Sequence, residues 1–181
     1  MSIPNGLSEI KKKYGNPSAN GILSQNWKKK YLTTVSLPFP MRIAGNLKKS
    51  ITVIEFNKKA ANALVQAFTL AYRYARIQMK KKYGYDKTTD FYNKVTNDFI
   101  CAAKIDIFGG AFVFRKKRGS NKLSLHSYGI AIDINPQENA MGTKGNMPEW
   151  FIQCMKKYEF VWGGDWKSSK DPMHFQLASG A

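Results

Sequence analysis

The sequence is short of cysteines, of acidic residues and of long apolar runs, and each shortage narrows the class of protein. It holds two cysteines, Cys101 and Cys154, and neither belongs to a Cys-x-x-Cys pair. Two are too few for a disulfide scaffold, so we expect two buried free thiols, with one bridge between them as the alternative. No stretch approaches the ~18 apolar residues that cross a bilayer, which excludes a predicted transmembrane segment.

The first residues also lack the apolar stretch and small-residue cleavage site of a signal peptide. We therefore expect the protein to be made and first held in a cytoplasm. Its 181 residues are 43% hydrophobic, which is enough for a core. We expect a single domain over residues 1–181, with an N-terminal extension of short helices and loops at 1–37 and a core at 38–181. A segment as short as the extension would not be stable alone.

Acidic residues are scarce beside basic ones. Lysine and arginine total 29 against 12 acids, which gives a net charge of +17. Lysine triplets stand at 11–13, 28–30 and 80–82, and a fourth basic cluster covers 116–118. A surface of this sign attracts nucleic acid, anionic membranes or the anionic polymers of a bacterial envelope, and a solvated surface that only maintains solubility is the alternative.

The apolar pattern of the first half predicts strands followed by a long helix. Residues 37–43 read as extended because each proline disfavours helix in the residue before it, and residues 51–56 are β-branched and strand-like. Residues 58–82 carry apolar side chains at helical spacing, with Asn57 as the cap. Residues 84–99 look irregular or weakly helical.

The second half is predicted to consist mainly of strands and turns. Strand character is seen at 105–114, where it is broken at Gly109 and Gly110, most clearly at 130–134, and again at 173–177. One helix is expected at 148–158, with Asn146 as its cap. The fold class is therefore α+β, a small antiparallel sheet with helices packed on one side.

The chain has only two histidines, His126 and His174, and each lies near a carboxylate. In the strand 130–134 the three isoleucines share one face, so Asp133 faces the other way. A carboxylate in so apolar a strand needs a partner, and a cation would supply one. His126 lies seven residues earlier, across a turn that Gly129 can make, so its ring can return to the face of Asp133.

The second histidine is preceded by Asp171 and followed on the same strand face by Gln176. Pro172 favours a turn, which would bring Asp171 beside His174. Two imidazoles and one carboxylate suit catalytic zinc, which leaves its fourth position to water. A further carboxylate can then move the proton of that water, and Asp171 is the candidate. The alternative for any lone histidine is a structural or surface role.

The string Ser-x-His-x-x-Gly-x-Ala-x-Asp-Ile at 124–134 resembles the signature of the D-Ala-D-Ala carboxypeptidase and L-alanyl-D-glutamate endopeptidase family of zinc peptidases. Residues 162–168 (Trp-Gly-Gly-Asp-Trp-Lys-Ser) and the pattern Asp-x-x-His-Phe at 171–175 resemble the second signature of its phage-type branch. Arg-x-x-Arg-Gly-Ser at 115–120 is similar to that branch too. The strong resemblance covers about 112–177, and a weaker one reaches back to about residue 37.

The resemblance implies that Zn²⁺ is held by three side chains and that a fourth is the catalytic acid and base. The metal ligands would be His126, Asp133 and His174, and the acid and base would be Asp171. Its α+β domain would then be a single peptidase domain with residues 38–181 as the catalytic core.

Four further residues would serve the substrate or the ligands. An upstream arginine of the family binds a substrate carboxylate or polarises the scissile carbonyl; Arg115 is the first choice and Arg118 the second, with a solvated role as the alternative for each. Ser124 is expected to orient a ligand by hydrogen bonding. Family members commonly have Glu where this chain has Gln176, so His174 would rely on a neutral amide oxygen.

The function implied is that of a zinc-dependent peptidoglycan peptidase, and we expect an endopeptidase of a phage lysin. Such a protein would be a monomer, would leave the host cytoplasm for the cell wall or travel with the virion, and would be drawn to anionic wall polymers by its basic surface. The same site would serve a D-Ala-D-Ala carboxypeptidase. Alternatives of other classes are a basic nucleic-acid-binding protein with a structural metal and a non-catalytic wall-binding module.

Overall fold

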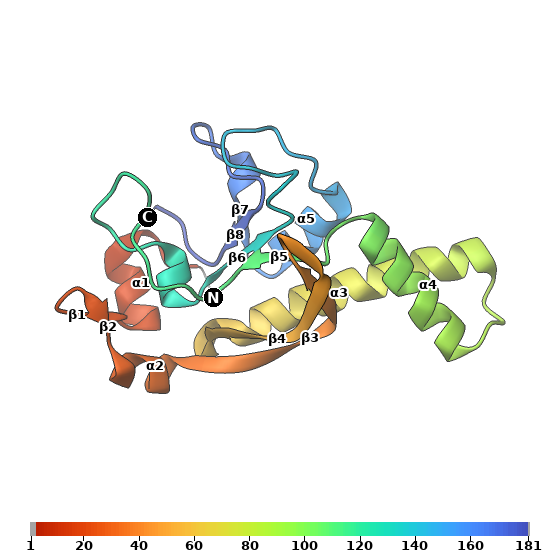
Figure 1. Ribbon diagram of the computed structural model, residues 1–181, viewed down its shortest axis with the longest axis horizontal. Coiled ribbons are helices and arrows are strands. Elements are labelled where there is room, and N and C mark those ends of the chain that lie inside the picture. The colour runs from red at the N-terminus through yellow and green to blue at the C-terminus, as the bar shows by residue number, and fades with distance from the viewer. Residues whose placement is uncertain (1–2, 181) are drawn as a thin grey trace.

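A six-stranded sheet forms the centre of the structure, a computed structural model that describes residues 3–180 (Figure 1). Neighbouring strands are antiparallel except β3 and β5, which run parallel. The predicted fold class, α+β with helices on one side of the sheet, is confirmed. In spatial order the strands are β4 (Asn46–Asn57), β3 (Leu32–Ile43), β5 (Ile107–Gly110), β6 (Ala131–Ile134), β8 (His174–Gln176) and β7 (Val161–Trp162).

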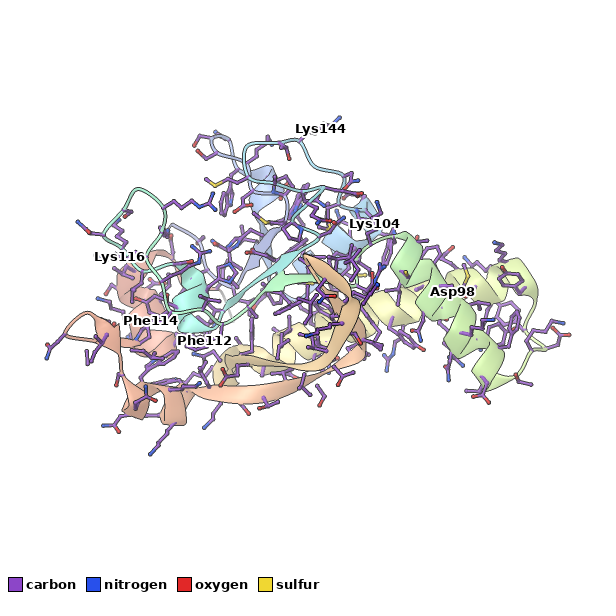
Figure 2. All side chains as sticks on the ribbon, viewed as in Figure 1. Asp98, Lys104, Phe112, Phe114, Lys116 and Lys144 are labelled. Carbon is purple, nitrogen blue, oxygen red and sulfur yellow. The ribbon has the colours of Figure 1, made fainter. Side chains whose placement is uncertain are left out.

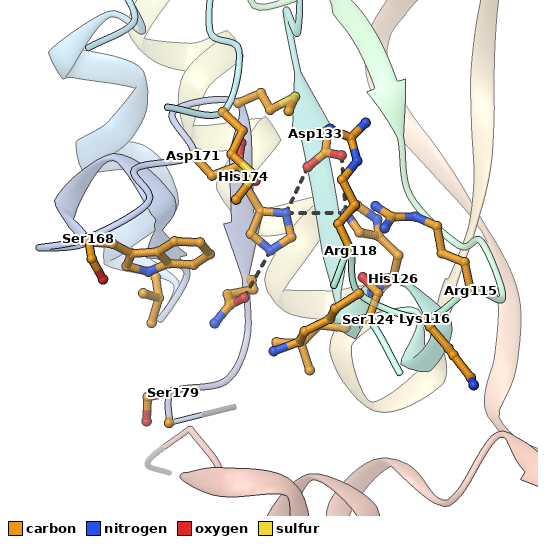
Figure 3. A pocket seen from close by; sticks show the side chains of 18 residues that line it. Arg115, Lys116, Arg118, Ser124, His126, Asp133, Ser168, Asp171, His174 and Ser179 are labelled. Atoms are coloured by element: carbon orange, nitrogen blue, oxygen red, sulfur yellow. Dashed lines mark hydrogen bonds and ion pairs between the residues drawn. The ribbon is translucent and has the colours of Figure 1, made fainter. Parts of the chain in front are cut away.

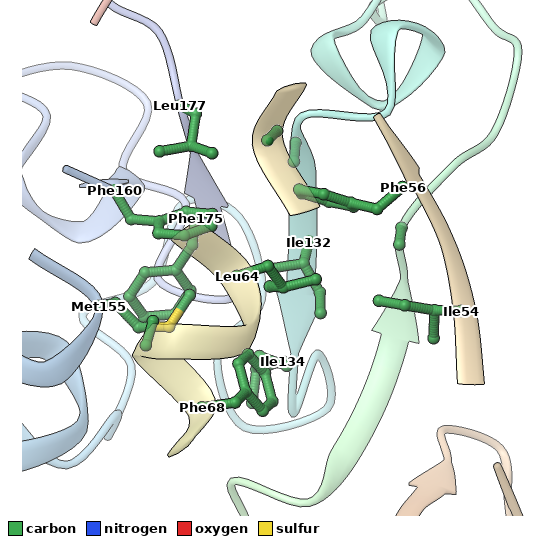
Figure 4. Close-up of a cluster of buried hydrophobic side chains, with 14 of the residues drawn as sticks. Ile54, Phe56, Leu64, Phe68, Ile132, Ile134, Met155, Phe160, Phe175 and Leu177 are labelled. Atoms are coloured by element: carbon green, nitrogen blue, oxygen red, sulfur yellow. The ribbon is translucent and has the colours of Figure 1, made fainter. Parts of the chain in front are cut away.

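The long helix α3 (Lys58–Tyr83) covers one face of this sheet together with α5 (Glu149–Lys157). The side chain of Asn57 caps α3 by accepting a hydrogen bond from the backbone N of Lys59, as predicted. Leu64 and Phe68 of α3 pack against the apolar face of β6 and β8, where each fully buried side chain contributes about 1.5–3 kcal/mol (Figure 4). No helix within residues 3–180 is long and apolar enough to cross a membrane.

Residues 89–102 form a regular helix, α4 (Thr89–Ala102), so of the two alternatives for 84–99 the irregular one holds only for 84–88 and the helical one for the rest. The Thr88 hydroxyl caps it by accepting from the backbone N of Phe91. Tyr92, Thr96 and Ile100 are buried at a spacing of four residues. The helix packs on the C-terminal half of α3, and the two project from the body as a hairpin that carries Asp98 far from Lys116 (Figure 2).

Three smaller expectations needed correction. Strand β5 ends at Gly110, so the chain leaves the sheet well before residue 114. Helix α5 lies where predicted, but Pro148 is at its N-cap, and the side chain of Asn146 instead donates to Glu138. Both cysteines are free, yet Cys101 is exposed because it lies on the outer face of α4, whereas Cys154 is buried as expected.

The N-terminal segment is made of short elements: α1 (Gly6–Tyr14), the β1 (Ser18–Ala19) and β2 (Ile22–Leu23) hairpin, and α2 (Gln25–Tyr31). The boundary expected between residues 37 and 38 stays a prediction; it falls inside β3. The start of α1 is bound to the opposite end of the chain. The backbone N of Gly6 donates to the Ser179 carbonyl at 2.8 Å, and that of Ser179 donates to Pro4 at 2.9 Å.

Candidate metal centre

Three side chains converge on the face of the sheet opposite the long helix. Asp133 on β6 and His174 on β8 are direct neighbours in the antiparallel register. His126 comes from the short 3-10 helix η1 (Leu125–Tyr128), just before β6. Nδ1 of His174 lies 2.8 Å from Asp133 Oδ1, and Nε2 of His126 lies 3.2 Å from Oδ2 and 3.3 Å from that Nδ1 (Figure 3).

The local sequence explains why His126 turns back over the sheet. The Ser124 hydroxyl accepts a hydrogen bond from the backbone N of His126 and so caps η1. Gly129 ends η1 with a φ of 64°, and a Cβ there would lie 2.8 Å from Leu32. Ser124 therefore positions His126 through its backbone.

Two other acceptors fix the rings. Nδ1 of His126 lies 2.6 Å from the carbonyl of Ala111, which can only accept, so the proton sits on Nδ1 and the Nε2 lone pair faces the centre. Nε2 of His174 lies 3.0 Å from Oε1 of Gln176. The amide nitrogen of Gln176 donates to the Ala178 carbonyl, which orients Oε1 of Gln176 toward His174. Nδ1 of His174 is therefore the nitrogen that faces the centre and can bind a metal.

This donor set fits zinc. Ligands ~2.0–2.2 Å from a tetrahedral zinc lie roughly 3.3–3.6 Å apart, and the donor atoms here need only small shifts from 2.8–3.3 Å. Burial raises the pKa of Asp133. Where the facing nitrogens of His126 and His174 carry protons in place of a metal, their hydrogen bonds to Asp133 outweigh burial and hold its pKa far below the ordinary value. The carboxylate is thus ionised, as a metal ligand must be, and the three residues form a group that could hold the ion.

Asp171 lies beside this group, in the turn predicted from Pro172. Its carbonyl accepts from the backbone N of His174 at 3.0 Å, and its own N donates to Gly163. Burial raises the pKa of the Asp171 carboxyl. Electrostatic interaction with His174, His126 and Arg115 opposes the rise, and the negative charge of Asp133 adds to it. Its Oδ1 is buried and has no hydrogen-bond partner among residues 3–180. A carboxyl oxygen that no protein group occupies is available to a water or a substrate.

A cavity of about 930 Å³ surrounds these residues and is large for a ligand site (~300–1,000 Å³). Arg115 and Arg118 both line it, and in Figure 3 both side chains extend toward the metal group. The Ser127 hydroxyl contacts the backbone of Arg115 at both its N and its carbonyl oxygen, 2.9 and 2.8 Å away. Ser127 and the carbonyl of Ala111 were not predicted, since the first is in a variable position of the string and the second is a backbone atom.

Two histidines and a carboxylate that could hold a metal, with the carboxyl of Asp171 beside them, define the site of a metal-dependent hydrolase. A family model described as D-alanyl-D-alanine carboxypeptidase matches residues 118–177, the segment that carries all four of these residues. The match confirms the predicted resemblance to this family of zinc peptidases. The protein is a zinc metallopeptidase whose general substrate is peptidoglycan. Arg115 lies outside the matched segment.

Proposed function

We propose that the protein is an endopeptidase of phage-lysin type that cleaves an amide bond within the stem peptide of peptidoglycan. The observation that carries the proposal is the convergence of two oriented imidazoles and a carboxylate beside Asp171, whose buried Oδ1 has no hydrogen-bond partner within residues 3–180. The resemblance of residues 162–175 to the phage-type branch and a cavity larger than a dipeptide needs favour an internal bond.

In this proposal each side chain has a separate task. His126 through Nε2, His174 through Nδ1 and Asp133 through its carboxylate would hold Zn²⁺. The ion, when bound, lowers the pKa of water toward ~7 and polarises a carbonyl oxygen. Asp171 accepts the proton of the attacking water and delivers it to the leaving nitrogen. A guanidinium, that of Arg115 before that of Arg118, stabilises the negative charge that develops on the carbonyl oxygen.

A D-Ala-D-Ala carboxypeptidase is the second candidate, and the description of the matching family favours it. It would use the same residues in the same roles. The two differ in their products, because a carboxypeptidase releases free D-alanine and an endopeptidase releases two peptide fragments. Mass spectrometry of muropeptides digested with and without a chelator separates them.

The role of Asp171 is tested by Asp171→Asn, which keeps the shape and removes the base. We expect kcat to fall by ~10²–10⁴-fold while the circular dichroism spectrum and zinc content are kept. The matched control is Asp165→Asn, since Asp165 is exposed, pairs with Lys156 and does not line the cavity. Full activity in a folded, zinc-loaded Asp171→Asn protein would contradict the mechanism.

The remaining proposals concern the molecule outside its site. We propose that the protein acts as a monomer, on the cell wall after release from the host cytoplasm or from the virion. The net charge of +17 supports a further partner, the anionic polymers of that wall.

A further inference from the structure

The hairpin of α3 and α4 ends in a tip that stands clear of the rest of the molecule. The two helices project from the body, away from β6 and β8 (Figure 1). The tip is the segment 80–91, which is the last turn of α3, the loop and the first turn of α4, and residues 81–90 are all exposed. A projecting end of this kind meets a broad surface more readily than it encloses a small ligand.

Positive charge gathers on this hairpin. Residues 73–94 contain seven lysines and arginines and two aspartates, a net charge of +5. The lysine triplet 80–82 forms no salt bridge within residues 3–180. Lys87 pairs with Asp86 at 3.0 Å, so one of the two acids already has a cationic partner. The triplet is therefore available to an external anion.

Aromatic rings are interleaved with these lysines. Tyr85 is 70% exposed and Tyr83 is 39% exposed. The ammonium of Lys80 lies 5.9 Å from the centroid of the Tyr85 ring, and that of Lys82 lies 5.0 Å from the centroid of the Tyr83 ring. Cation–π attraction thus holds charges directly beside exposed rings.

The other two lysine triplets of the chain, at 11–13 and 28–30, have different surroundings. They also contact aromatic rings, but these rings are buried or half-buried, and they belong to Tyr14, Tyr31 and Phe112. The combination of a lysine triplet with strongly exposed rings is therefore particular to the hairpin tip.

The tip is also ordered by bonds of its own. The Tyr92 hydroxyl donates to the carbonyl of Gly84, which ties the loop to α4. The rings of Tyr83 and Phe91 pack edge to face with centroids 5.4 Å apart, which joins the end of α3 to the start of α4. The lysines and tyrosines are thus presented together before any partner arrives, which lowers the entropy cost of binding.

We propose that this tip binds the surface of a lipid bilayer that is rich in anionic headgroups. Tyrosine rings concentrate at the boundary between hydrocarbon and water, and the long side chains of lysines carry their charges out to the phosphates. An anionic polymer would be attracted by charge alone and would leave the exposed rings of Tyr83 and Tyr85 without a role. Since β6 and β8 lie away from the tip, the metal centre stays outside the bilayer. Membrane binding of this kind is independent of the proposed peptidase function.

Co-sedimentation with lipid vesicles tests the surface. The full chain is mixed with vesicles of phosphatidylcholine alone, or of phosphatidylcholine mixed with phosphatidylglycerol, and should bind only the anionic ones. Lys81→Gln/Lys82→Gln should weaken that binding ~30-fold, because each lysine near an anionic bilayer contributes to the attraction. Tyr85→Ser keeps every charge and should weaken it ~3-fold, the effect of burying roughly 30 Å² of the ring.

The matched control is Lys11→Gln/Lys12→Gln, which removes the same charge from exposed positions of α1, far from the tip (Figure 1). It should retain vesicle binding, because charges more than ~10 Å from a surface are largely screened at 0.1 M salt. All three variants should keep the circular dichroism spectrum of the unaltered protein. If the glutamine variant of the tip does not fold, Lys81→Ala/Lys82→Ala carries the same comparison.

Equal binding to both kinds of vesicle, or an equal loss in the lysine variants of α1 and of the tip, overturns the proposal. The proposal also fails if the unaltered protein ignores vesicles while the tip variant loses binding to purified cell walls, since the partner is then an anionic wall polymer. Vesicle binding by a protein without chelator-sensitive hydrolysis of peptidoglycan overturns the proposed function and leaves the bilayer surface in place.

Discussion

The two metal-site histidines depend on acceptors that are not ligands themselves. His126 is oriented by a backbone carbonyl, and His174 by the side chain of Gln176, which is in turn fixed by Ala178. A neutral amide thus orients His174 at the position where the family resemblance leads us to expect a glutamate, and it adds no negative charge. The orientation is kept, and the basicity of the His174 nitrogen is expected to be lower.

Replacing Gln176 should therefore change the metal site in either direction. Gln176→Ala removes the acceptor of His174 Nε2 and should weaken zinc binding by ~10–100-fold, whereas Gln176→Glu should strengthen it. Affinity is measured by competition with a chromophoric chelator, independently of activity. The control is Gln153→Ala on the exposed side of α5. Unchanged affinity in both Gln176 variants would show that the contact has no influence on the ligand.

At this scale the sequence predicted the residues of the centre but not their surroundings. The alternation around Asp133 and the turn at Pro172 placed side chains on faces, and the structure brings the predicted ligands and Asp171 together. The Ala111 carbonyl, fifteen residues from the ring it orients, could not be predicted because every residue has a carbonyl.

Among the elements, the loop after β6 sets the position of the strand that carries His174. The side-chain oxygen of Asn139 accepts a hydrogen bond from the backbone N of Asn146, and the backbone carbonyl of Asn139 accepts one from the backbone N of Met173. Glu138 joins the loop to Lys104 and to Asn146. This network lies outside the metal centre, yet it fixes the backbone of Met173, the residue directly before His174.

The loop should give a measurable acid dependence of stability. Hydrogen bonds from Asn146, Lys104 and Asn135 lower the pKa of Glu138 to about 2, from an ordinary 4.5. A carboxyl with a depressed folded pKa stabilises fully above its ordinary value, and that contribution is lost as the pH falls toward 2. In urea unfolding, Glu138→Gln should thus be less stable than the unaltered protein at neutral pH, with the difference shrinking between pH 4.5 and 2. A difference independent of pH would contradict the assignment.

The projecting hairpin was the element least visible in the sequence. Helix α4 buries one narrow stripe against a single helix, and the central residue of that stripe, Thr96, is polar, which interrupts the apolar pattern by which a helix is recognised. The caps at Thr88 and Asn57 were equally local features, but only Asn57 preceded a strong apolar pattern. The parallel pairing of β3 with β5 joins distant segments, and no local pattern specifies it.

The projecting hairpin also contains a buried polar group, the hydroxyl of Thr96, whose removal should stabilise the fold. The Thr96 hydroxyl is buried between the helices without a hydrogen-bond partner in residues 3–180. Thr96→Val keeps the shape and removes that polar group, so the free energy of unfolding should rise by about 1 kcal/mol with activity unchanged. Thr89→Val, at the exposed start of α4, is the control and should bring no gain. A loss of stability in Thr96→Val would show that the hydroxyl has a partner such as water.

For the whole molecule, the excess of positive charge predicts salt-sensitive association with cell walls. The Debye length falls from ~10 Å at 0.1 M to ~3 Å at 1 M salt, so long-range attraction to an anionic wall should disappear over that range. Co-sedimentation of the Asp171→Asn protein with purified walls measures binding without digestion. Walls stripped of anionic polymers are the control, and binding that ignores both salt and stripping would exclude the electrostatic partner.

The pairing of Pro4 and Gly6 with Ser179 has a consequence for how the site forms. Residues 176–178 orient His174, and their continuation is held by the first described turn of the chain. A contact spanning nearly the full sequence is formed late in folding, because the entropy of closing so long a loop must be overcome first. High-affinity zinc uptake should then be among the last events of folding. Zinc would then bind tightly only to the fully folded protein, and zinc retention would report whether the contacts of Pro4 and Gly6 with Ser179 have formed.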